Sequence, residues 1–122
     1  MMTYDPENIF ARILREELPC KKLAEDEYTL AFEDINPQAP VHVLVIPKGS
    51  YVDWTDFAAK ASVEEQAAFT KMIAHVADLT GIAEAGFRVI SNIGWHGHQE
   101  VPHLHMHVLG GAPVGPMLAR TN

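Results

Sequence analysis

The segment His103-Leu104-His105-Met106-His107-Val108-Leu109 decides how the rest of the chain is interpreted. Side chains two positions apart in a β-strand lie on the same face of the sheet, so the three imidazoles would share one face. Leu104, Met106 and Val108 would then occupy the other face and anchor the strand in an apolar core. The segment therefore predicts a strand over residues 103–109 with one histidine-lined face.

Three interpretations of this histidine row remain open. A solvent-facing polar strand would more typically mix Lys, Thr and Glu. Three histidines can bind catalytic zinc, but same-face neighbours on one strand lie ~7 Å apart, and no carboxylate follows the row to complete a ligand set. A neutral imidazole is a good nucleophile near neutral pH, and neighbouring imidazoles can fix its tautomer. We favour nucleophilic catalysis at phosphorus.

The composition is that of one ordinary globular domain. The chain has 122 residues, of which 48% are hydrophobic and 20% charged. The net charge of −7 argues against a nucleic-acid partner, which would favour clustered Lys and Arg. Cys20 is the only cysteine, so an intrachain disulfide is excluded and a reducing compartment is favoured. With no signal-like or membrane-spanning apolar run, we expect a soluble, cytoplasmic protein without membrane partners.

Two helices are predicted. The first begins at Asp5-Pro6-Glu7-Asn8, which combines capping side chains with a proline, and ends at Leu18-Pro19. The second covers Ser62 to Leu79: Ser62 and Glu65 match a capping box, and Gly81 suits the C′ position. Its apolar stripe is wide enough for the helix to pack against both its own sheet and a second copy of the chain, although the protomer's own core could also use the whole stripe.

Five strands are predicted, and together with the helices they indicate an α+β antiparallel sheet carrying helices on one face. The strands cover residues 22–25, 28–32, 41–46, 87–91 and 103–109. A Gly- and His-rich loop at 92–99 precedes the last strand. The chain is expected to be a single domain over residues 1–122, with an irregular tail at 112–122.

The whole chain resembles the histidine triad (HIT) family. Residues 103–109 match its His-φ-His-φ-His-φ-φ signature, in which φ is apolar, and further matches include Ile9-Phe10, Asp34-Ile35-Asn36-Pro37, His42 and Gly110-Gly111. The chain looks like the bacterial members of the Hint branch, the purine nucleoside phosphoramidases. This resemblance implies a HIT-like fold, a five-stranded antiparallel sheet with two main helices on one face. It also implies a homodimer, a purine nucleotide substrate and no metal or cofactor.

The resemblance also implies catalytic roles for four histidines. His105 matches the nucleophile that accepts the nucleotidyl group, and His103 matches the residue that orients it. His107 matches a contact to the phosphate and the leaving group, and His42 joins the same hydrogen-bond network. The implied reaction is hydrolysis of purine nucleoside 5′-phosphoramidates through a covalent nucleotidyl-histidine. The alternatives are dinucleoside polyphosphate hydrolysis and a non-catalytic nucleotide-binding or scaffold role.

Nucleotide contacts follow from the same resemblance. Asp34 matches the carboxylate that holds the ribose hydroxyls. An apolar slot for the purine is matched by Phe10, Ile13, Leu18, Phe32 and Ile35. Contacts around the α-phosphate and leaving group are matched by Asn92, Glu100 and the backbone of Val101.

The chain departs from the family pattern beside the triad. Glu100 stands where animal members carry serine, Pro102 where an aromatic residue is common, and His98 where glycine is common. These departures concern the preference for a leaving group rather than the reaction class. The cysteine pair of some relatives is absent at Phe10-Ala11-Arg12, so their structural zinc is not expected.

Overall fold

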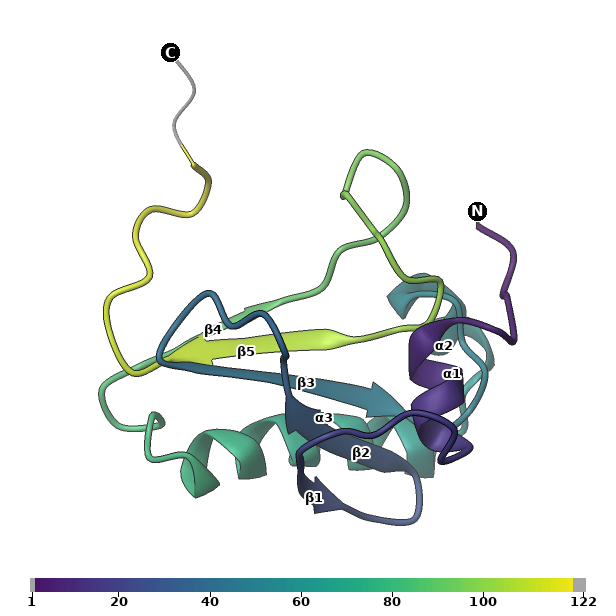
Figure 1. Ribbon diagram of the computed structural model, residues 1–122, viewed down its shortest axis with the longest axis horizontal. Helices are drawn as coiled ribbons and strands as arrows, with labels where there is room; N and C mark the ends of the chain where they lie inside the picture. The colour runs from purple at the N-terminus through teal and green to yellow at the C-terminus, as the bar shows by residue number, and fades with distance from the viewer. Residues whose placement is uncertain (1, 120–122) are drawn as a thin grey trace.

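Five strands form one antiparallel sheet in the computed structural model, which describes residues 2–119 (Figure 1). The strands are β1 (Lys22–Glu25), β2 (Thr29–Glu33), β3 (Val41–Pro47), β4 (Arg88–Ile90) and β5 (Met106–Gly110). Their order across the sheet is β1-β2-β3-β5-β4, so β3 and β5 are central neighbours. The predicted five-stranded antiparallel sheet is confirmed.

The long helix α3 (Val63–Leu79) forms as its sequence predicts. The Ser62 side chain accepts from the Glu65 N–H, and the Glu65 side chain accepts from the Ser62 N–H, which completes the capping box. Thr80 is the C-cap residue, and Gly81 follows with a φ of 77°, a left-handed conformation that costs glycine little. Both ends of this helix are therefore specified locally.

The first helix, α1 (Ile9–Leu14), begins as predicted but ends earlier. The Asn8 side chain caps its start by accepting from two backbone N–H groups. The predicted end at Leu18 is wrong, because Glu16 takes a φ of 63° and the Glu17 N–H donates to the Arg12 carbonyl. This reversal terminates the helix before the proline that we expected to end it.

A further short helix, α2 (Trp54–Lys60), is absent from the sequence prediction. Asp53 caps it by accepting from the Asp56 N–H at 2.8 Å. Phe57 of α2 joins the same apolar cluster as Phe69 of α3, so α2 and α3 are the two helices on one face of the sheet. The predicted first helix, α1, instead packs against the opposite face, where Phe10 contacts β2 and β3 residues.

Successive residues of the central strands supply two separate apolar clusters. On the α3 side, Ala31, Val43, Val45 and Val108 contribute to the larger cluster. The smaller cluster on the α1 side consists of Phe10, Leu30, Phe32, Leu44 and Ile46. This alternation places His42, which precedes Val43, on the α1 side of the sheet.

The last strand begins later than predicted. β5 starts at Met106, and its last pair with β3 is Val45 with Met106, so His103 to His105 lie before the ladder. Pro47 ends β3 and has no N–H to donate, and the Leu104 N–H donates to the Tyr51 carbonyl instead. The segment nevertheless keeps its alternation, because Leu104 joins the α3-side cluster.

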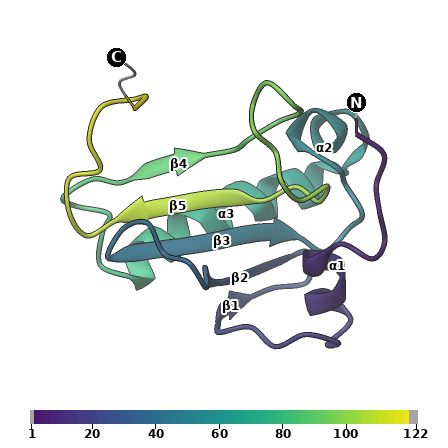
Figure 2. The same cartoon turned by 45° about the horizontal axis from the view of Figure 1, so that its top comes forward.

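After β5 the chain carries no helix or strand over residues 112–119, as predicted; positions 120–122 of the predicted tail lie outside the described residues. Figure 2 shows this tail leaving the sheet at the end of β5. Within residues 2–119, no helix has the length and apolar character needed to cross a membrane.

Candidate active site

The predicted histidines gather on the α1 side of the sheet. The ring centroids of His105 and His107 lie 5.1 Å apart, and those of His42 and His107 lie 5.2 Å apart. Phe10 of α1 packs edge-on against His105, with centroids 4.9 Å apart. Helix α1 therefore forms one wall beside the central histidine.

His103 is fully buried and held at both ring nitrogens. Its Nε2 lies 2.9 Å from the Pro47 carbonyl, which can only accept, so Nε2 carries the proton. Its Nδ1 then accepts from the Tyr4 hydroxyl at 2.8 Å. Burial lowers the pKa of His103 to about 4, which keeps the ring neutral. No local signal in the sequence indicated Tyr4.

His105 has its tautomer fixed by the backbone. Its Nδ1–H donates to the His103 carbonyl at 2.8 Å, so the lone pair of the neutral ring lies on Nε2. Burial lowers the pKa of His105, and only 7% of the residue is exposed. The orienting contact from position 103 therefore comes from its main-chain oxygen, while the His103 imidazole faces Tyr4 and Pro47.

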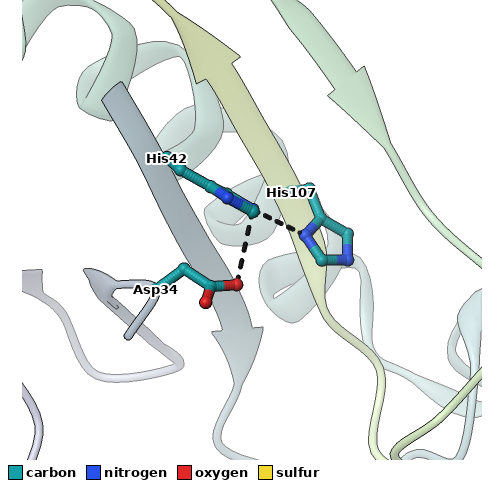
Figure 3. A group of neighbouring side chains, drawn as sticks. All are labelled: Asp34, His42 and His107. Atoms are coloured by element: carbon teal, nitrogen blue, oxygen red, sulfur yellow. Dashed lines mark hydrogen bonds and ion pairs between the residues drawn. The ribbon is translucent and has the colours of Figure 1, made fainter. Parts of the chain in front are cut away.

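His42 and His107 form a second, directional chain of hydrogen bonds (Figure 3). The Gln38 N–H donates to His42 Nδ1 at 3.0 Å, so the proton of a neutral His42 lies on Nε2. That Nε2–H donates to His107 Nδ1 at 2.9 Å, which leaves His107 with a proton on Nε2. Burial, followed by the neighbouring His105 and His42, lowers the pKa of His107 to about 4, and burial also lowers the pKa of His42.

Asp34 lies beside this chain, at the start of the loop between β2 and β3. One carboxylate oxygen, Oδ1, accepts from the Asn36 N–H at 2.8 Å, and Oδ2 lies 3.4 Å from His42 Nε2. The side chain is 17% exposed, so a ligand can reach it. Figure 3 shows the carboxylate directed toward His42.

The metal interpretation can be compared with this geometry. Within residues 2–119, one group of possible metal-binding side chains has all its ligand atoms within 4.8 Å of one another. It consists of Asp34, His42 and His107 and is not the triad itself. One carboxylate oxygen and two imidazole nitrogens could bind a divalent cation. An ion there would replace the hydrogen bond from His42 Nε2 to His107 Nδ1, whereas His103, whose ring nitrogens face Tyr4 and Pro47, lies outside this group.

The residues predicted to form the purine slot are only partly gathered. Phe10 and Phe32 are buried in the α1-side cluster, and Ile13 packs against it. Leu18 is half-buried. Ile35 is 88% exposed and does not join them. The apolar surface nearest the triad is therefore built around Phe10.

The three contacts predicted around the α-phosphate and leaving group lie at the loop that precedes the triad. The backbone carbonyl of Val101 accepts from the Gln99 side chain at 3.0 Å, and its side chain packs against the α1-side cluster. Asn92 donates to the Gly97 carbonyl at 2.8 Å, so its side-chain amide holds the loop together. Glu100 is exposed, and its Oε1 lies 2.9 Å from His98 Nε2. The sequence analysis did not include His98 among the site residues. The sequence feature that could have indicated it is the histidine at a position where the family commonly has glycine.

A five-stranded antiparallel sheet that carries this row of neutral, linked imidazoles defines a histidine triad protein. The chain belongs to the HIT family: the family model described as "HIT domain" matches residues 15–114. A 13.2 kDa HIT-like protein of Azospirillum brasilense is 57% identical, with 97% of each chain covered. The purine nucleoside phosphoramidase of Escherichia coli K12 is 47% identical, with 93% of this chain and 94% of that protein covered.

Solved structures show the same relationship. A histidine triad protein from Clostridium difficile superposes with a TM-score of 0.82 at 37% identity, covering 95% of this chain and all of that one. A HIT family hydrolase from Clostridium thermocellum gives a TM-score of 0.81 at 39% identity, with 93% and 97% of the two chains covered.

Proposed function

We propose that this protein is a hydrolase that cleaves purine nucleoside 5′-phosphoramidates through a covalent intermediate on His105. The observation that carries the proposal is the tautomer of His105. Its Nδ1–H is engaged by the His103 carbonyl, so Nε2 has a free lone pair. The phosphoramidase name of the Escherichia coli relative, at 47% identity, supports the choice of substrate class.

The proposed reaction has two steps. His105 Nε2 attacks the α-phosphorus, and the P–N bond of the substrate breaks with its electron pair on the amine nitrogen, which takes a proton from solvent. Water then attacks the phosphorus and gives up a proton to solvent, the bond to His105 breaks with its electron pair on Nε2, and the nucleoside monophosphate leaves. His107 Nε2–H is available to donate a hydrogen bond to a phosphate oxygen, and such donors stabilise charge that develops in the transition state.

Nucleotide binding is proposed to use the two ends of the site. The partly exposed Asp34 carboxylate can accept from the ribose hydroxyls, and the surface around Phe10 and Ile13 suits a purine ring. A dinucleoside polyphosphate hydrolase would use the same nucleophile. A nucleotide-binding scaffold would use the same pocket but would not need a nucleophile.

One experiment separates these functions. Purified protein is given adenosine 5′-phosphoramidate and diadenosine polyphosphate in parallel, with and without exhaustive chelation. We expect faster turnover of the phosphoramidate, equal rates with chelator, and an adenylated His105 peptide in quenched samples. Faster polyphosphate cleavage would favour the second activity, no turnover would favour the scaffold role, and loss on chelation would indicate a metal at Asp34, His42 and His107.

We also propose that the protein is a homodimer. Most of the α3 stripe is used by the protomer itself, since Phe69, Met72 and Val76 are buried in its own core. The support comes instead from the sheet edge, where Phe87 and Val89 at β4 are 39% and 41% exposed. Light scattering at micromolar concentration should give a mass of two chains. A one-chain mass with full activity would contradict the proposal.

A further inference from the structure

The loop that precedes the triad, residues 92–100, is firmly attached to the body of the protein. Gln99 is buried, and its side chain donates to the carbonyls of Val52 and Val101 at 2.6 and 3.0 Å. The same side chain accepts from the Gly94 N–H at 2.9 Å. The exposed side chains of this loop are therefore displayed on a fixed backbone.

His98 occupies an unfavourable backbone conformation in this loop. Its φ is 61°, in the left-handed region that glycine enters without steric cost and other residues enter rarely. Its imidazole is 85% exposed, so burial of the ring does not explain the residue. Its one side-chain interaction within residues 2–119 is with Glu100, between Nε2 and Oε1 at 2.9 Å. A local turn sets this φ, because the His98 N–H donates to the Trp95 carbonyl and the Gln99 N–H donates to the Gly94 carbonyl, the same reversal as at Glu16. The turn does not require a histidine, so what this side chain adds at position 98 is its contact with Glu100.

Glu100 is 75% exposed and ends this loop three residues before His103, the first histidine of the triad. Burial has the largest effect on His105 and His107 and lowers both pKa values, while the negative charges of Asp34 and Glu100 oppose this. The two carboxylates reach the site from different directions. In Figures 1 and 2 the Asp34 loop lies by the end of β5, and the 92–100 loop lies by its start.

We propose that His98 is a positioning residue that holds the Glu100 carboxylate where the leaving amine departs, and so makes the enzyme prefer amines that carry a second, positive charge. The inference rests on the proposed phosphoramidase function. The His98 Nε2–H donates to Oε1, and Oε2 makes no hydrogen bond within residues 2–119. With Asp34 engaged at the nucleotide end, Glu100 is the anionic group available to an amine's distal ammonium.

The test compares three adenosine 5′-phosphoramidates whose leaving groups are ammonia, butylamine and 1,4-diaminobutane. We measure the ratio of kcat/KM for the diamine to that for butylamine. His98→Gly and Glu100→Gln should each lower this ratio by up to about fivefold, the range expected for one exposed charge interaction. The ammonia substrate has no distal ammonium, so its kcat/KM reports separately any change in the basal reaction of each variant. His96→Ala, which removes another exposed imidazole of the loop, is the control and should leave the ratio unchanged.

A thermal melt separates this role from a structural one. Glycine adopts the φ of position 98 freely, so His98→Gly should keep or raise Tm while it lowers the ratio. A lower Tm with an unchanged ratio would mean that His98 only stabilises the loop. An unchanged ratio in both variants would overturn the inference alone, whereas failure of the unaltered chain to cleave any of the three substrates would overturn the proposed function itself.

Discussion

On the α3 side of the sheet, β2, β3 and β5 contribute Ala31, Val43, Val45 and Val108 to one continuous apolar cluster. On the α1 side, the same strands contribute His42 and His107 beside a smaller apolar cluster. The second face also buries the imidazoles of His42, His103 and His105, which bond to His107, to the Tyr4 hydroxyl and to backbone groups. Alternate residues of one strand lie on opposite faces of the sheet. A residue of the apolar core and a histidine of the candidate active site can therefore be direct neighbours in the sequence.

This difference has an energetic consequence. An apolar side chain on the α3 side stabilises the fold by leaving water, and its replacement leaves a cavity. A histidine on the α1 side loses hydration when it is buried, and its hydrogen bonds have to replace what water provided. Substitutions on the two faces should therefore affect different measurements.

The largest expected effect is on turnover, at the α1 face. His105→Ala should reduce kcat by about 10³-fold or more, because removal of a positioned nucleophile leaves only binding and electrostatic contributions. Its Tm should stay close to that of the unaltered chain, and nucleotide binding measured by calorimetry should persist. Near-normal single-turnover rates in this variant would exclude His105 as the nucleophile.

The largest expected effect on stability is at the α3 face. Phe69 is 3% exposed and packs against Phe57, so Phe69→Ala should lower the free energy of unfolding by about 3–5 kcal/mol. Urea denaturation measures this change, with the 79%-exposed Val63→Ala as a control on the same helix. The folded fraction should keep its kcat. A fall in kcat per folded molecule would show that the two faces are coupled.

Asp34→Ala tests the proposed binding of the ribose by this carboxylate. Loss of a charged acceptor should weaken ribonucleotide binding by roughly 1.5–3 kcal/mol, because hydrogen bonds to charged groups are worth about that much. Binding of 2′,3′-dideoxynucleotides, which lack both hydroxyls, should change much less. Calorimetry on matched ligands gives the comparison, and equal losses for both ligands would place the ribose elsewhere.

Acid should destabilise the protein through the histidine face. The pKa of His103 is about 4 in the folded chain against 6.5 for an unperturbed histidine, so the unfolded chain binds more protons between these values. Stability is therefore complete above about pH 6.5 and falls as the pH drops toward 4, by about 2 kcal/mol from His103 alone between pH 7.5 and 5. Urea denaturation at several pH values measures this slope. His103→Gln should flatten it, and an equal slope in that variant would assign the effect to other groups.

The smallest expected effect is at Tyr4. Tyr4→Phe removes one hydrogen bond to the buried His103 Nδ1 and should cost about 1 kcal/mol of stability. Because His103 in turn supplies the carbonyl that binds His105, a modest decrease in kcat should accompany it. Tyr28→Phe, at a tyrosine that is half-buried like Tyr4, is the matched control. A loss of stability without any change in kcat would limit Tyr4 to a structural role.

The sequence by itself determined the features that depend on neighbouring residues. Alternation of His and apolar residues over 103–109 specified which side chains share a face, and the Ser62–Glu65 pair specified where α3 begins. The reversal at Gly81 follows from the same kind of local preference. Each of these features is encoded within a few positions of the chain, so a pattern was enough to predict it.

Only the tertiary structure decided the features that join distant residues. β5 begins at Met106 rather than His103 because Pro47, in another strand, cannot continue the ladder. The tautomers of His103 and of the His42–His107 pair depend on Tyr4, Pro47 and Gln38, which reach them from elsewhere in the chain. A residue's type gives its possible hydrogen bonds, but which nitrogen holds the proton depends on the partner that folding places beside it.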